Sequence, residues 1–256
     1  MYICTHSPTD SPKQQQSQAP LGGYELGNYV SKYPNPTHRF VNVRTDTISG
    51  LDDCASRNLM AAQVTDVFAT HMIEYATTNV FSSSYKGRAF AFFRHPVKRV
   101  IDEFFYRQHA TFEGTFDAEL ASSSLYEFSL SDKYVENFEV KSINGITDDT
   151  PVTVEHVDIA KEVLRQKMLV LIFEWYDVSV VRLEKYFGWW DEIGVWDNYT
   201  INNCHFDFVE YSDHIGDHPM VPTKEDTLEN IMVRNWADVE LYHYAKNLFA
   251  EQAKLL

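Results

Sequence analysis

The sequence lacks the features that define several large classes of protein. Three cysteines, Cys4, Cys54 and Cys204, lie far apart in 256 residues. This spacing argues against a disulfide framework and against a zinc knuckle, and favours isolated thiols. No run of 18 apolar residues is present, so the sequence predicts no transmembrane segment. The N-terminus shows no basic segment followed by an apolar stretch, so we expect no secretory signal there.

Positive charge is also scarce. The 22 Lys and Arg residues are outnumbered by 37 Asp and Glu residues, which gives a formal net charge of −15. A duplex nucleic-acid ligand is therefore excluded, because such binding needs a broad basic face. A highly sulfated polyanion is an unfavourable partner for the same reason, although an acidic protein can hold a local basic pocket. The hydrophobic fraction of 44% is typical of a globular chain with one well-filled core.

The composition divides the chain near residue 36. Residues 1–36 are rich in Ser, Gln, Pro and Thr and predict a flexible tail, followed by a single domain over 37–256. We expect that domain to open with a strand over 38–43. Two helices are expected next, over 52–60 and 66–81.

The clearest local pattern is a strand followed closely by a helix. The apolar run Ala89 to Phe93 predicts a strand buried on both faces. Pro96 fits the first position of a helix, where its missing N–H costs nothing. Beyond it, helical spacing places five apolar side chains on one face: Val97, Val100, Ile101, Phe104 and Phe105.

The same order of elements recurs later in the chain. The elements expected there are a helix over 157–167, a strand over 168–173, a helix over 178–187 closed by Gly188, a loop over 191–218 and a helix over 236–256. Alternating strands and helices predict an α/β fold, with a mostly parallel sheet and helices on both of its faces.

Arg94 follows the strand expected over 89–93. In an open α/β sheet, ligands lie beyond the carboxyl ends of the strands, and the start of a helix favours an anion. Arg94 is therefore a candidate anion ligand. The alternative is a structural role, in which Arg94 caps a neighbouring carbonyl or pairs with a surface carboxylate.

The amino-acid sequence around Arg94 resembles the motif of a known protein family. Residues 92–106 resemble the sulfotransferase motif Arg-x-Pro-x-x-Arg-x-x-Ser-x-x-Tyr. Further segments resemble landmarks of that family in the expected order: Gly87-Arg88, Glu136-Asn137-Phe138, 160–164, Phe187-Gly188-Trp189 and Asp238-x-x-Leu241-Tyr242. The resemblance covers roughly residues 40–256.

The resemblance implies a fold, a donor and a reaction. The implied fold is the three-layer α/β sheet of P-loop nucleoside-triphosphate hydrolases. The implied donor substrate is 3′-phosphoadenosine 5′-phosphosulfate (PAPS), from which sulfate passes to a hydroxyl or amine, on a glycan acceptor. Relatives of this type act in the Golgi or secretory pathway. By the same resemblance Arg94 grips the 3′-phosphate of the donor, while Arg99 supports the turn as a structural contact.

Smaller differences from the family pattern concern Lys141 and Phe105. Lys141 stands where the family often has arginine, and so it keeps the charge without bidentate geometry. Phe105 fills the tyrosine position of the motif, with Tyr106 one residue late.

Asp102 occupies the serine position of the motif, which is a larger departure. A carboxylate about 4 Å from a phosphate costs roughly 4 kcal/mol at an effective dielectric constant near 20. The lost charge-assisted hydrogen bond adds about 1.5–3 kcal/mol. We therefore expect weak donor binding, unless Asp102 pairs with Arg99 or Lys98 or points away.

The 5′-phosphosulfate loop of the family is also missing. Its pattern is Pro-Lys-x-Gly-[Thr/Ser], whereas Pro12-Lys13 is followed here by glutamines. Losing the backbone N–H groups and the lysine of that loop removes much of the machinery that stabilises the leaving phosphate. The N-terminal unit of the fold is accordingly expected to be truncated or replaced.

The histidines near residue 214 are candidates for a metal site. His214 and His218 have a spacing that suits a shared metal on a helix, but Gly216 and Pro219 favour a solvated loop together with His205 and Asp207. We therefore expect no metal.

Three residues are conceivable general bases, His71, Glu74 and His109, and we assign no catalytic base among them. The aromatic residues Phe104, Phe105, Tyr106, Trp189 and Trp190 are expected mainly in the core, with stacking on a base or sugar as the alternative.

Three interpretations of function remain. The first is a PAPS-dependent sulfotransferase. The second is a catalytically inactive relative that acts as a binding or scaffold module, which Asp102 and the missing loop favour. The third is a truncated gene product, which an upstream reading frame encoding the missing loop would reveal.

Overall fold

The computed structural model describes residues 26–30, 37–41, 43–62, 65, 67–109, 111, 116–147, 149–188 and 225–255. Its contacts divide the chain into two compact units. Unit 1 contains Met1–Arg88 and Ser142–Thr147, and unit 2 contains Ala89–Lys141 and Asp148–Leu256. Each unit has a hydrophobic core of its own.

Unit 1 contains an antiparallel pair of strands. Strand β1 (Leu26–Val30) pairs with β2 (Thr37–Val41), and Leu26 lies opposite Val41. β2 confirms the strand expected over 38–43. β1 lies within residues 1–36, where composition indicated no regular structure, because pairing with β2 supplies backbone hydrogen bonds that composition does not report. The rest of that stretch lies outside the described residues.

Three short helices complete the described part of unit 1. They are α1 (Ile48–Ser56), α2 (Leu59–Ala62) and α3 (Ile73–Asn79). The Thr47 hydroxyl accepts the Gly50 N–H, so α1 begins four residues earlier than the helix expected over 52–60. Leu51, Cys54, Leu59, Ala76 and Val80 form the buried core.

Unit 2 is built on two parallel strands. β3 (Ala89–Phe93) confirms the strand expected there, and β4 (Met168–Ile172) confirms the second within one residue. Ala89 lies opposite Met168 and Phe93 opposite Ile172. All five residues of β4 are buried. These are the only parallel strands among the described residues, so the larger three-layer sheet stays a prediction.

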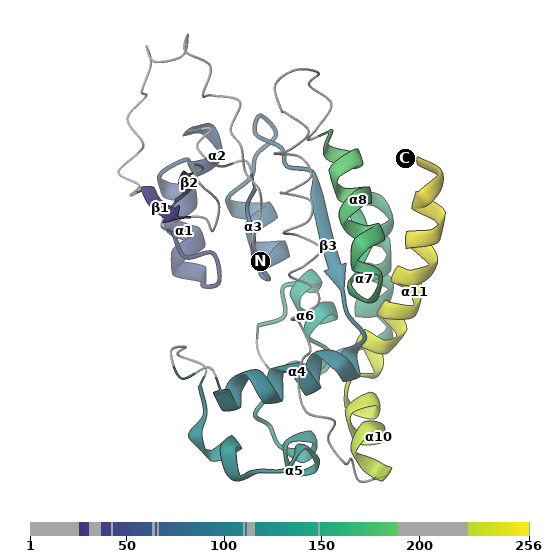
Figure 1. Ribbon diagram of the computed structural model, residues 1–256. Helices are drawn as coiled ribbons and strands as arrows, with labels where there is room; N and C mark the ends of the chain where they lie inside the picture. The colour runs from purple at the N-terminus through teal and green to yellow at the C-terminus, as the bar shows by residue number, and fades with distance from the viewer. Residues whose placement is uncertain are drawn as a thin grey trace. The chain divides into compact units, whose positions relative to one another are not determined.

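Seven helices and three 3₁₀ turns of unit 2 are described. They are α4 (Pro96–His109), η2 (Ala118–Ser122), α5 (Leu125–Leu130), α6 (Phe138–Asn144), α7 (Val154–Lys167), η3 (Phe173–Trp175), α8 (Tyr176–Phe187), α10 (Glu225–Arg234), α11 (Trp236–Gln252) and η4 (Ala253–Leu255). The last residues of α6 belong to unit 1. In Figure 1, α11 runs beside α7, and both helices pack on β4.

Four of these helices were predicted from the sequence. α4 begins at Pro96 as expected, and α8 ends at Gly188, whose φ of 66° is the left-handed conformation that glycine adopts most easily. α7 and α11 match their expected ranges except at the ends. The expected loop over 191–218 lies outside the described residues.

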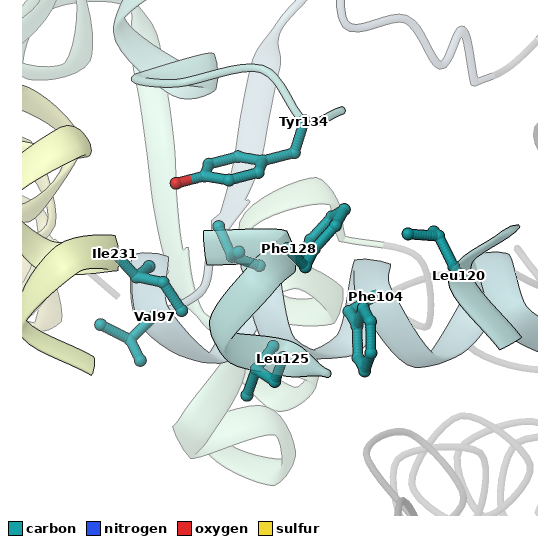
Figure 2. Packing of buried hydrophobic residues seen from close by; sticks show 8 residues of the cluster. Val97, Phe104, Leu120, Leu125, Phe128, Tyr134 and Ile231 are labelled. Atoms are coloured by element: carbon teal, nitrogen blue, oxygen red, sulfur yellow. The ribbon is translucent and has the colours of Figure 1, made fainter. Parts of the chain in front are cut away.

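The apolar face of α4 forms the centre of one core cluster (Figure 2). Val97, Val100 and Phe104 are buried there, with Ile101 and Phe105 packed against them. The cluster also contains residues of η2, of α5 and the segment that follows it, and of α10: Leu120, Leu125, Phe128, Tyr134 and Ile231. The expected amphipathic face is thus confirmed. Its packing holds α4 in position, and α4 begins three residues after the end of β3.

Candidate functional site

The candidate site lies where β3 and β4 end. Because the two strands are parallel and Phe93 lies opposite Ile172, the residues that follow each strand emerge at the same edge. Arg94 and His95 follow β3, and Phe173 and Glu174 follow β4. The start of α4 adds a third element to this edge.

The Arg94 guanidinium forms an ion pair with Asp102. Nη1 of Arg94 contacts Oδ2 of Asp102, and the two side chains are 19% and 22% exposed. Cζ of Arg94 also lies 4.8 Å from the centre of the Phe173 ring. Arg94 is therefore enclosed between an aromatic ring and a carboxylate that both belong to unit 2.

This pair departs from what the sequence led us to expect of Asp102. We considered pairing with Arg99 or Lys98, or a side chain that points away, and the structure instead pairs Asp102 with Arg94 itself. Two turns of α4 bring the carboxylate back toward the residue that precedes the helix, and the attraction of the two charges holds it there. The structural alternative named for Arg94, pairing with a carboxylate, is the arrangement observed.

Arg99 lies among residues of α6 and α11. Its Nη2 donates to Oδ1 of Asn235 at 3.2 Å, and its Nε lies 3.5 Å from Oε1 of Glu139. The guanidinium also lies 5.4 Å from the centre of the Phe138 ring. These contacts are structural, as the sequence analysis expected for Arg99.

A second group of polar residues at this edge was missed by sequence reasoning. Oε1 of Glu174 accepts the backbone N–H of His95 at 3.0 Å, and Oε2 accepts the Tyr242 hydroxyl at 2.8 Å. The His95 and Tyr242 rings meet edge to face, 5.2 Å apart. The available signal was that Glu174 follows a buried strand, but nothing in the sequence indicated that α11 brings Tyr242 to it.

The environment of this group shifts two pKa values in opposite directions. Burial lowers the pKa of His95, and the neighbouring groups His243, Lys98 and Lys246 lower it further, against the opposing effect of Glu174. Burial raises the pKa of Tyr242, with a further contribution from its hydrogen bond to Glu174. His95 is thus kept neutral near pH 7, and Tyr242 keeps its proton.

Two lysines border the same edge. Nζ of Lys98 lies 3.8 Å from Oε1 of Glu174. Nζ of Lys246 lies 5.0 Å from the centre of the Trp175 ring and 5.9 Å from that of Tyr242. Arg94 and Lys98 at this edge thus each have a carboxylate partner from this chain.

The remaining predicted residues do not join this edge. His109 is the last residue of α4, at the end opposite Arg94, while His71 and Glu74 belong to unit 1. Lys141 lies on α6. Residues that lie outside the described part of the chain are Trp189, Trp190, His205, Asp207, His214 and His218.

The expected packing of the aromatic run is found for two of its members. Phe104 is buried and Phe105 packs against the same core, while Tyr106 is 49% exposed. In the described residues, no three His, Cys, Asp or Glu side chains are grouped so as to hold a metal ion. None of the described helices has the length and apolar character needed to cross a membrane.

Comparisons of this chain with protein-family models, with curated proteins and with solved structures found no match. The resemblance to sulfotransferases thus rests on the motif residues and remains a prediction. The geometry around Arg94 is the main observation that bears on it.

Proposed function

We propose that the chain is a sulfotransferase-like domain that does not transfer sulfate and serves as a binding or scaffold module. The observation that carries this proposal is the ion pair between Arg94 and Asp102 at the end of β3. The guanidinium that would hold a donor phosphate is already matched by a carboxylate of the same chain.

A donor phosphate at Arg94 and the Asp102 carboxylate are both negatively charged. A phosphate that reached Arg94 would displace Asp102 or lie beside it. A like-charge contact at about 4 Å costs roughly 4 kcal/mol at an effective dielectric constant near 20. At about 1.4 kcal/mol per factor of ten, this corresponds to about a thousandfold loss of affinity. The partial enclosure of both side chains reduces the screening that water would provide.

The residues present therefore do not fit PAPS as they stand. Arginine binds phosphate through two parallel N–H donors, and here one terminal nitrogen of Arg94 is engaged by Asp102. Nε of Arg94 is buried and has no hydrogen-bond partner among the described residues, so it is not presented to an outside ligand. The sequence also lacks the phosphosulfate loop pattern.

The direct test is a pair of measurements on the unmodified protein. Transfer of labelled sulfate from PAPS to a panel of glycans is expected to remain at the level of a no-protein control. A thermal shift with adenosine 3′,5′-bisphosphate is expected to be absent, whereas a ligand at 100 times its Kd would stabilise the protein by about 2.7 kcal/mol. Turnover above the control contradicts the proposal.

An active PAPS-dependent sulfotransferase is the second candidate function, and the position of Arg94 favours it. This residue lies at the carboxyl end of a parallel strand and beside the first turn of α4, where anions bind in many α/β proteins. That function requires the donor to displace Asp102. A thermal shift without turnover would contradict the weak binding expected from the Arg94–Asp102 pair and would indicate a module that still recognises the nucleotide.

A further inference from the structure

Side chains from the starts of α6 and α11 cap each other's helices. Oδ1 of Asn137 accepts the N–H groups of Ala237 at 3.0 Å and Asp238 at 3.3 Å. In return, Oδ1 of Asp238 accepts the Val140 N–H at 3.0 Å, and its Oδ2 accepts the Glu139 N–H at 3.2 Å. Each helix thus satisfies backbone donors that the other would leave unpaired.

Asn235 completes this arrangement. Its Oδ1 accepts the backbone N–H of Asn137 at 3.0 Å, and its Nδ2 donates to the Ile231 carbonyl at 2.9 Å. We call Asn137, Asn235 and Asp238 the clasp. All three residues are buried, so the clasp excludes water from the first turns of both helices.

The clasp and the charged side chains beside it carry more negative than positive charge. Arg99 is the cation beside it, and it lies 3.5 Å from Glu103, 3.5 Å from Glu139 and 3.8 Å from Asp238. The Asp238 side chain is 0% exposed and the Glu139 side chain 17% exposed. Glu103 also pairs with Arg107, so if every group were ionised, the Arg99 guanidinium would still face two further carboxylates, those of Glu139 and Asp238, in a mostly enclosed site.

Charged groups on the neighbouring elements do not offset this excess. β4 carries no titratable residue between Met168 and Ile172. Arg107 of α4 pairs with Glu103 and Asp117 and so offsets Glu103 only. Arg234 of α10 pairs with Glu136, and Lys161 of α7 pairs with Glu240 and Asp158. Binding one proton is the least costly way to reduce the charge of such a site.

We propose that Asp238 keeps its proton in the folded protein beside Glu139, and that the clasp loosens when rising pH removes it. Glu139 lies against the same guanidinium as Asp238, and its negative charge favours the protonated form of Asp238. Oε2 of Glu139 is buried without a hydrogen-bond partner among the described residues, which disfavours a fully ionised pair. The chain would therefore contain a pH-sensitive contact between two helix starts.

The direction of the pKa shift agrees with this geometry. Burial raises the pKa of Asp238 well above 3.8, and the charge and hydrogen bond of Glu139 raise it further, against the effects of Arg99 and the Val140 N–H. Above the unfolded pKa, the folded state then binds more protons than the unfolded state. Stability is consequently present at low pH and falls as pH rises through the folded pKa.

The test compares urea unfolding of the full chain and Glu139→Gln between about pH 5 and pH 9. Where the folded state holds one more proton than the unfolded state, unfolding releases that proton, and the unfolding equilibrium constant rises about tenfold per pH unit. The unmodified protein is expected to show this added destabilisation with rising pH, and Glu139→Gln is expected to lack it. Glu162→Gln is the matched control, because the pKa of the exposed Glu162 is lowered to about 2, outside this window.

Infrared spectroscopy tests the proton without a variant, in case Glu139→Gln fails to fold. A protonated carboxyl band is expected in the unmodified protein near pH 7 and should disappear at higher pH together with stability. Parallel pH profiles for the protein and Glu139→Gln would overturn the proposal. So would the absence of a protonated carboxyl band near neutral pH.

Discussion

Gln252 closes the outer edge of β4 at Val170. Its Oε1 accepts the Val170 N–H at 2.9 Å, and its Nε2 donates to the Met168 carbonyl at 2.8 Å. On the same strand, Ser179 accepts the Ile172 N–H at 3.0 Å and donates to the Ile172 carbonyl at 2.9 Å. Side chains of α11 and α8 thus take the place of a neighbouring strand, and they satisfy backbone groups that are buried.

Gln252→Ala should lower the free energy of unfolding. The change leaves the Val170 N–H and the Met168 carbonyl buried without partners, so we expect a loss of about 2–4 kcal/mol in the free energy of unfolding, measured in urea. Gln166→Ala, on an exposed part of α7, is the matched control and should change stability by less than about 0.5 kcal/mol. Equal losses in the two variants would show that the edge does not depend on Gln252.

Asn137 has a second structural role besides the clasp. Its φ of 52° is left-handed, a conformation that costs most side chains about 1–2 kcal/mol. Asn137→Ala should add conformational strain and remove both capping hydrogen bonds, which together should lower the free energy of unfolding by about 2–4 kcal/mol. Asn137→Gly removes the caps alone and should therefore cost less, as measured by thermal unfolding.

Asn58 supplies the control for this comparison. It has the same φ of 52° on an exposed position after α1. Asn58→Ala should cost only the conformational strain, about 1–2 kcal/mol. If Asn137→Ala cost no more than Asn58→Ala, the reciprocal capping would contribute little.

His95 is expected to titrate below its ordinary pKa of 6.5. Because the folded state disfavours the charged imidazole, the unfolded state binds more protons below pH 6.5. Stability is then present above pH 6.5 and is lost as pH falls through the folded pKa. NMR titration of the His95 ring, assigned with His95→Gln, measures this directly.

Two neighbours of His95 should shift that titration in opposite directions. Lys246→Met removes a repelling cation and should raise the pKa of His95, whereas Glu174→Gln removes a stabilising anion and should lower it further. Shifts of the same sign in both variants would contradict the electrostatic account of this edge.

Much of unit 2 was predictable because its signals are local. The apolar run Ala89 to Phe93, the proline at the start of α4 and Gly188 at the end of α8 each act within a few residues. Sequence patterns of this kind report hydrophobic period and backbone conformation directly. α5, α6 and α10 were not predicted from the sequence.

The contacts within the site were not predictable in the same way. Asp102 was recognised as the unusual residue of the motif, yet which of three nearby arginine and lysine side chains it would meet depends on rotamers and on the exact end of β3. The clasp and the Tyr242–Glu174 contact join residues that lie far apart in the chain. Such pairings follow from the packing of α11 on β4, which no local pattern encodes.

Calorimetric titration of adenosine 3′,5′-bisphosphate into Asp102→Ser tests the central claim most directly. This variant frees Arg94 and restores a hydroxyl at the motif position, so its affinity is expected to exceed that of the unmodified protein by up to about a thousandfold. Asp158→Ser, which removes the same charge from an exposed position on α7, should bind as weakly as the unmodified protein. Equally weak binding by Asp102→Ser, or tight binding by the unmodified protein, would contradict the account.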